Sequence, residues 1–164
     1  MHSYEDANLI RRIMRRTAAT RPMAWFYAHT LDHIDRFVFR LTRGRATFVS
    51  WVAGLPIVML TTSGAKTGVR RTLPLVAIPT EDCVVVIASN YGRRRNPAWS
   101  YNLKAHPRAS ITFGGVTRDV VARQLSGEER EHWFARGVDI YPGWIHYRRR
   151  AAHRQIPVFR LEPV

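Results

Sequence analysis

A short cationic stretch between two apolar runs carries the residue types best suited to binding an anion. It lies between the β-prone runs 57–60 and 75–78, and this pattern predicts two strands joined at 64 to 68. The two glycines of Gly64-Ala65-Lys66-Thr67-Gly68 permit close approach of a ligand to the backbone. Backbone N–H groups beside several cations suit a phosphate or carboxylate. We therefore expect an anionic cofactor to bind at a loop tip that carries Lys66, Thr67, Arg70 and Arg71.

Two other interpretations of this stretch are open. Gly-x-Lys-x-Gly also occurs as an ordinary hairpin tip whose lysine points into water. A Walker phosphate loop needs a glycine directly before the lysine and another five residues before that glycine, but this chain has Ala65 and Leu60 there. A nucleotide triphosphatase is therefore not expected.

The sequence contains none of the familiar arrangements of side chains that catalyse a reaction without a cofactor. There is no Gly-x-Ser-x-Gly elbow, no Cys/His metal spacing and no carboxylate pair in a plausible cleft. His29 and His33 have the spacing of a helical zinc pair, but Thr30 stands where the metalloprotease pattern needs glutamate, so no metal is expected. The reaction is therefore assigned to a cofactor, and the chain would bind it, orient it and exclude water.

Length and charge limit the class of protein. The chain has 164 residues, enough for one domain with a sizeable core, and a net charge of +14. Nucleic acid, an anionic membrane surface or a polyanionic small molecule would each fit that charge. Cys83 is the only cysteine, which excludes an intrachain disulfide and favours a cytoplasmic protein. It is expected to be a small buried hydrophobic residue.

The N-terminal segment, residues 1–44, reads as two basic amphipathic helices that lie on or beside the following domain. In the first helix, four apolar residues lie opposite four arginines, namely Leu9, Ile10, Ile13 and Met14 against Arg11, Arg12, Arg15 and Arg16. The second, from about 23 to 42, is expected to pack on the domain. Reversible attachment of residues 1–20 to anionic lipid at the inner face of the membrane is a hypothesis.

Residues 45–164 read as a mainly antiparallel α+β domain. Apolar runs predict strands near 46–53, 56–63, 73–79, 83–89, 109–113, 116–123 and 156–161, with Gly114-Gly115 as a hairpin turn. Asn96-Pro97 predicts a helix cap followed by a helix with Trp99 and Leu103 on one face. Ser126 and Glu129 form a capping-box pattern that opens a helix running towards Val138. This pattern by itself supports an α+β barrel or sandwich.

Several separated blocks, taken together, resemble the deazaflavin-dependent nitroreductase and quinone reductase family over roughly residues 36 to 163. The blocks are Thr-Thr-Ser-Gly-Ala-Lys-Thr-Gly-Val-Arg-Arg-Thr-Leu-Pro-Leu at 61–75, Ala88-Ser89-Asn90-Tyr91-Gly92, Asn96-Pro97-Ala98-Trp99 and Asn102-Leu103. The resemblance implies a split β-barrel of the flavin-binding kind and coenzyme F420 as cofactor. It also implies hydride transfer from the reduced deazaflavin to a quinone or nitroaromatic acceptor.

The resemblance implies a role for each matched position. Lys66, Thr67, Gly68 and Arg71, with Arg70 beside them, would hold the phosphodiester and the glutamate tail. Pro74, Leu75 and Val76 would lie beside the ring, Ala88, Ser89 and Asn90 along its edge, and Asn96, Pro97, Ala98 and Trp99 near the phosphate. Ser89 would donate a hydrogen bond to the cofactor or the acceptor oxygen. Tyr141, Trp144 and Tyr147 resemble an aromatic cover over the substrate face, although they could instead be core residues.

Four departures from the family pattern leave the acceptor open: Ala65, Asn90, Ala98 and Trp144. Two alternatives remain beside the deazaflavin reductase. One is a split-barrel oxidoreductase that binds FMN, and the other is a basic nucleic-acid- or lipid-binding module without catalysis. Such a module would need aromatics interleaved with cations on an open sheet, so nucleic acid is not the expected partner. The protein is expected to be a monomer or a homodimer.

Overall fold

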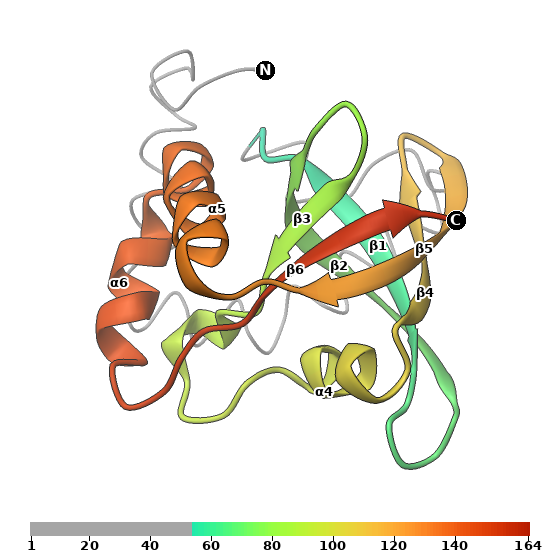
Figure 1. Ribbon diagram of the computed structural model, residues 1–164, viewed down its shortest axis with the longest axis horizontal. Helices are drawn as coiled ribbons and strands as arrows, with labels where there is room; N and C mark the ends of the chain where they lie inside the picture. Colours follow the sequence, from blue (N-terminus) through green and yellow to red (C-terminus); the bar gives the residue numbers. More distant parts are fainter. Residues whose placement is uncertain (1–53) are drawn as a thin grey trace.

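The computed structural model describes residues 54–164, which form a six-stranded antiparallel barrel with strand order β1-β2-β3-β6-β5-β4 (Figure 1). The predicted helices within 1–44, the strand near 46–53 and His29 and His33 lie outside the described residues. The strands are β1 Ile57–Ser63, β2 Arg70–Pro79, β3 Val84–Ile87, β4 Arg108–Phe113, β5 Val116–Gln124 and β6 Val158–Pro163. The α+β barrel class is confirmed.

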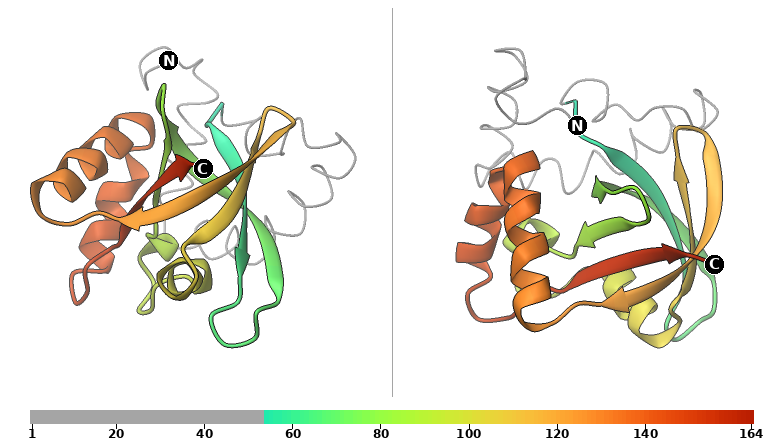
Figure 2. Two further views of the ribbon diagram at one scale, coloured as in Figure 1. Left: turned by 45° about the vertical axis from the view of Figure 1, so that its right-hand side comes forward. Right: turned by 45° about the horizontal axis from the view of Figure 1, so that its top comes forward.

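Helices cover the barrel at two places. The short helix α4 (Ala98–Ala105) lies near β1, while α5 (Gly127–Ile140) and α6 (Gly143–Arg150) lie together at one side of the barrel (Figures 1 and 2). A one-turn helix, η1 (Asn90–Gly92), contacts α6. None of the helices within residues 54–164 has the length and hydropathy needed to cross a bilayer.

Two apolar clusters follow from the two-residue repeat of the strands. Successive side chains point to opposite faces of a strand, so Val85 and Val86 join different clusters. The barrel cluster contains Val86, Leu60 and Phe159 and is extended by Trp99 and Leu103 of α4. The helix cluster contains Val85, and α5 and α6 bury their apolar faces in it. Cys83 belongs to this second cluster, as expected of a small buried residue.

The barrel is incompletely paired between β2 and β3. β2 pairs with β1 along its first seven residues, Arg70 to Val76, but with β3 only from Ala77 to Pro79. Beyond β3 the chain turns away from β2 and towards β6, where Ala88 N–H donates to the carbonyl of Pro157, the residue before β6, at 2.8 Å. No described strand therefore pairs with the second edge of β2 from residue 70 to 76, and we call this the open edge.

Proline at position 74 fits the open edge. Ala77 N–H donates to Pro56 O on the β1 side. Since N–H groups alternate sides along an antiparallel strand, the nitrogen of Pro74 and the N–H of Val76 face the open edge. A proline inside a strand is tolerated where its nitrogen has no partner strand. The presence of Pro74 in the sequence is thus consistent with an unpaired edge at this part of β2.

The structure corrects two local predictions, one on the loop tip and one on a helix cap. Arg70 and Arg71 are not at the loop tip, because β2 begins at Arg70 and pairs the two residues with Ser63 and Thr62. Asn96 is not the cap of α4, whose N-cap residue is Pro97 without a side-chain hydrogen bond. The hairpin at Gly114-Gly115 is confirmed, with positive φ of 58° and 85°.

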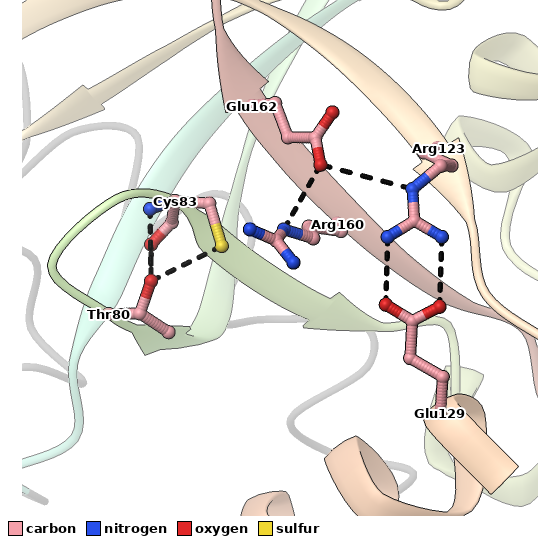
Figure 3. A network of polar contacts seen from close by, with 6 residues as sticks. All are labelled: Thr80, Cys83, Arg123, Glu129, Arg160 and Glu162. Carbon is pink, nitrogen blue, oxygen red and sulfur yellow. Dashed lines mark hydrogen bonds and ion pairs between the residues drawn. The ribbon is translucent and has the colours of Figure 1, made fainter.

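Ser126 is the N-cap residue of α5 but forms no capping box. Glu129 instead accepts two hydrogen bonds from the guanidinium of Arg123, at 2.9 and 2.7 Å (Figure 3). These bonds lower the pKa of the Glu129 carboxyl. Glu162 joins the same network through Arg123 Nε at 3.9 Å, and it also pairs with Arg160 at 3.1 Å. A charged partner on the neighbouring strand has therefore replaced the local backbone contact that the sequence predicts.

Candidate functional site

The loop between β1 and β2 is a closed turn. Gly64 N–H donates to Val69 O at 2.9 Å, and Gly68 N–H donates to Gly64 O at 2.8 Å. Gly68 has a φ of 66°, and a Cβ on Gly64 would lie 2.6 Å from the Thr67 hydroxyl. Glycine is therefore favoured at position 64 by limited space beside Thr67 and at position 68 by conformation.

A buried amide anchors this loop to α4. Asn102 Oδ1 accepts a hydrogen bond from Ala65 N–H at 2.9 Å, and Asn102 Nδ2 donates to the Thr62 hydroxyl at 3.0 Å. Asn102 belongs to one of the matched sequence blocks, but sequence reasoning gave it no role. Its spacing of three residues from Trp99 places it on the inward face of α4, and that spacing was the available signal. The loop is thus held by the same helix that closes the barrel.

Two cations beside this loop are free to bind an anion. Lys66 and Arg71 are exposed, and within residues 54–164 neither side chain has a hydrogen bond or an ion pair. Arg70 differs, since its Nη2 donates to the Ser110 hydroxyl at 3.2 Å. Lys66 and Arg71 are therefore the stronger candidates for holding a phosphate or carboxylate.

The open edge of β2 presents the predicted ring residues. Pro74, Leu75 and Val76 are half-buried. Leu75 packs against the barrel cluster and Val76 against the helix cluster, because they point to opposite faces of the strand. A ligand that contacts both must therefore lie across the strand edge.

The segment that follows β3 departs from β2 where the open edge begins. Ala88 and Ser89 are buried, and Asn90 and Tyr91 adopt the left-handed conformation, with φ of 48° and 56°. The hydroxyl of Ser89 has no hydrogen-bond partner within residues 54–164. Asn90 uses its amide internally, donating to Arg95 O at 2.7 Å. Ser89 is thus the predicted residue with a free donor at this position.

The residues from Asn96 to Trp99 differ in how deeply they are buried. Trp99 is 4% exposed, and its ring centroid lies 5.8 Å from that of Phe159 in the barrel cluster. Pro97 is half-buried and Ala98 is exposed, at the start of α4. The Asn96 side chain accepts a hydrogen bond from Arg154. Trp99 therefore acts as a core residue in this structure.

Arg154 is a residue that sequence reasoning missed. It lies between α6 and β6, and its guanidinium donates to Ser89 O at 2.8 Å, to Arg93 O at 3.0 Å and to Asn96. Burial lowers the pKa of this guanidinium. Its contacts are 58 to 65 residues away in sequence, so no local pattern could have identified it.

The three aromatics predicted as a cover are buried together. Tyr141, Trp144 and Tyr147 are 6%, 3% and 3% exposed, and the hydroxyls of Tyr141 and Tyr147 are 2.9 Å apart. Tyr147 also meets Tyr91 edge to face, with ring centroids 5.8 Å apart. This packing favours the alternative role as core residues, and their effect on the acceptor stays a prediction. Within residues 54–164, no three His, Cys, Asp or Glu residues are grouped to hold a metal ion.

Comparisons with known proteins agree on one family. The F420H(2)-dependent quinone reductase family model matches residues 35–163. Rv3178 of Mycobacterium tuberculosis, which carries the name F420H(2)-dependent quinone reductase provisionally, is 33% identical over 66% of this chain and 91% of its own length.

Two solved structures extend the comparison to the fold. The structure of an F420-H2 dependent reductase, FDR-A, has a TM-score of 0.60 and 41% identity, covering 65% of this chain and 94% of that one. A second structure, described as a domain-swapped dimer, has a TM-score of 0.63 and 34% identity, covering 86% of this chain and 99% of that one.

Proposed function

The chain belongs to the F420H(2)-dependent quinone reductase family, and from this membership we propose that the open edge of β2 is where coenzyme F420 binds. The observation that carries the proposal is the open edge itself. The unpaired edge of β2 begins where the chain after β3 departs from β2, at Ala88. The free cations Lys66 and Arg71 lie at one end. An elongated cofactor with a planar ring and an anionic arm matches this arrangement.

The chain's own groups have distinct tasks in this proposal. Lys66, Arg71 and the backbone of the 64–69 loop bind the anionic arm through charge-assisted hydrogen bonds. The Val76 N–H on the open edge and the Ser89 hydroxyl on the segment after β3 would be donors for polar atoms of a bound ring. The half-buried apolar side chains of Leu75 and Val76 exclude water. When bound, the reduced deazaflavin supplies the hydride.

We propose a quinone as the physiological acceptor class and a nitroaromatic compound as a further acceptor. Ser89 supports acceptor reduction, because its free hydroxyl can donate to an oxygen that gains negative charge. FMN remains the alternative cofactor, but one phosphate needs fewer cations than Lys66 and Arg71 together offer.

An anaerobic assay tests the proposed reaction. We expect the purified protein to oxidise reduced F420 when a soluble quinone such as menadione is added, followed by the return of oxidised-deazaflavin absorbance. A nitroarene and reduced FMN would be supplied in parallel reactions. Turnover with reduced FMN but not reduced F420 would establish the alternative cofactor. Tight F420 binding without oxidation by any acceptor would reject the reductase function.

We also propose that residues 1–20 attach the protein to anionic lipid. The support is the sequence pattern of an apolar face opposite Arg11, Arg12, Arg15 and Arg16. We expect the full chain to sediment with phosphatidylglycerol vesicles at low salt, and a chain that begins at residue 21 to remain in solution with unchanged menadione turnover. High salt should mimic the deletion. Absence of the full chain from the vesicle pellet at low salt would contradict this proposal.

A further inference from the structure

The segment from Ser89 to Asn96 has few backbone partners for its carbonyls. It follows β3 but leaves the barrel, and it contains the one-turn helix η1. Five of its carbonyls contact side chains: Asn90 donates to Arg95 O, His153 Nε2 lies 3.1 Å from Arg94 O, Arg150 donates to Tyr91 O at 3.5 Å, and Arg154 donates to Ser89 O and Arg93 O. Side chains thus hold a segment that strand pairing does not hold.

Arg154 provides three of these contacts from one rigid group. Nε donates to Arg93 O at 3.0 Å, Nη2 donates to Ser89 O at 2.8 Å, and Nη1 donates to the Asn96 side chain. The guanidinium therefore joins both ends of the segment and a point just beyond η1. A planar fork with five N–H donors can do this, whereas a lysine ammonium offers a single point of attachment.

The conformation between these contacts is one that residues with side chains rarely adopt. Asn90 and Tyr91 both have positive φ, at 48° and 56°, and neither is glycine. Such conformations persist when the surrounding contacts impose them. Without the guanidinium we expect this segment to relax towards commoner backbone angles. Ser89, whose free hydroxyl is a donor to the bound ring in the proposed function, would then move.

We propose that Arg154 is a positioning residue for the reaction: it fixes the segment 89–96 so that Ser89 is presented to the cofactor and the acceptor. This inference rests on the proposed function. It does not depend on contact between Arg154 and either ligand. The three hydrogen bonds of Arg154 all end on residues 89–96, so its loss should disturb this segment more than it disturbs the barrel.

The positioning role is tested with two substitutions at Arg154 and one control substitution at another arginine. Arg154→Ala removes all three contacts, and Arg154→Lys keeps the charge without the fork. Arg149→Ala is the matched control, because Arg149 is an exposed arginine of α6 with no hydrogen bond or ion pair within residues 54–164. The first readout is the rate at which trypsin cuts after Arg93, Arg94 and Arg95, identified by mass spectrometry. This readout needs no cofactor.

We expect both Arg154 variants to be cut at these three positions at least tenfold faster than the wild type and the control. We expect their kcat with reduced F420 and menadione to fall at least tenfold, while their affinity for F420 changes less than threefold, since Lys66 and Arg71 are intact. Methylguanidinium at millimolar concentration should restore part of the kcat to Arg154→Ala and none to Arg154→Lys, whose side chain occupies the site.

The outcomes separate this inference from the proposed function. A wild type without deazaflavin oxidation would reject the proposed function, and with it the role of Arg154 in the reaction, while the trypsin rates still report on the contacts. Faster cutting with unchanged kcat would overturn the positioning role. Equal cutting and equal kcat would overturn the contacts as well. If Arg154→Ala lowers the melting temperature, methylguanidinium rescue still decides: a kcat that does not rise with added methylguanidinium would overturn the proposal.

Discussion

Replacing Lys66 or Arg71 by alanine is expected to weaken F420 binding by roughly 1.5–3 kcal/mol, the range for hydrogen bonds to charged groups. At about 1.4 kcal/mol per factor of ten, this is a loss of tenfold or more for each variant. The melting temperature should hardly change, because both side chains are exposed and without partners within residues 54–164. Titration of deazaflavin fluorescence measures the affinity.

Two controls show whether the loss of affinity is specific to these two cations and to the anionic arm. Arg118→Ala removes an exposed cation from β5, a strand that does not pair with β1 or β2, and it should leave F420 affinity unchanged. A deazaflavin without the anionic arm should lose less affinity on mutation than the full cofactor does. Unaltered affinity in both Lys66→Ala and Arg71→Ala would exclude the loop as the binding site for the anionic arm.

The second large effect is expected at the buried aromatics of α6. Trp144 packs edge to face with Tyr141, with ring centroids 5.9 Å apart, and against the backbone of Gly137 in α5. A Cβ on Gly137 would lie 2.6 Å from the Trp144 ring, so the two helices meet here without space. Trp144→Ala should therefore cost about 3–5 kcal/mol of folding free energy. Thermal or urea unfolding measures this loss.

A milder substitution separates packing from acceptor choice. Tyr147→Phe keeps the ring but removes the hydroxyl that lies 2.9 Å from the Tyr141 hydroxyl. If Tyr147 also covers the acceptor, Tyr147→Ala should turn over bulky quinones or nitroarenes several-fold more slowly, with F420 affinity within about twofold, since a stacking contact is worth about 0.5–1.5 kcal/mol. Tyr147→Phe keeps the ring and should therefore keep the acceptor preference. Destabilisation with unchanged acceptor preference in the folded protein would leave these residues a packing role alone.

Local patterns predicted most of the elements. Gly114-Gly115 predicted the hairpin because both residues can take positive φ, and the apolar run at 83–89 predicted a strand, although not that its side chains would divide between two clusters. The helix that opens near Ser126 was also predicted, and α5 begins at Gly127. These features depend on neighbouring residues, which sequence reasoning can read.

Long-range contacts account for what the sequence did not reveal. Asn102 and Arg154 are joined to their partners across 37 to 65 residues, so their roles appear only when the barrel brings the segments together. The capping box failed for a related reason, because Arg123 on β5 offers Glu129 a charged partner that the sequence spacing does not show. The apolar run at 73–79 predicted strand β2. It did not predict that only three residues of β2, from Ala77 to Pro79, would pair with β3.

The proline in the open edge has a consequence for solubility. An unpaired strand edge is a template on which a strand from another molecule can add, and this is a common start of aggregation. Pro74 has no N–H, and its nitrogen faces the open edge, so an incoming strand would meet a missing donor in the middle of the row. The barrel can therefore keep an edge open for a small molecule while remaining a poor surface for sheet extension.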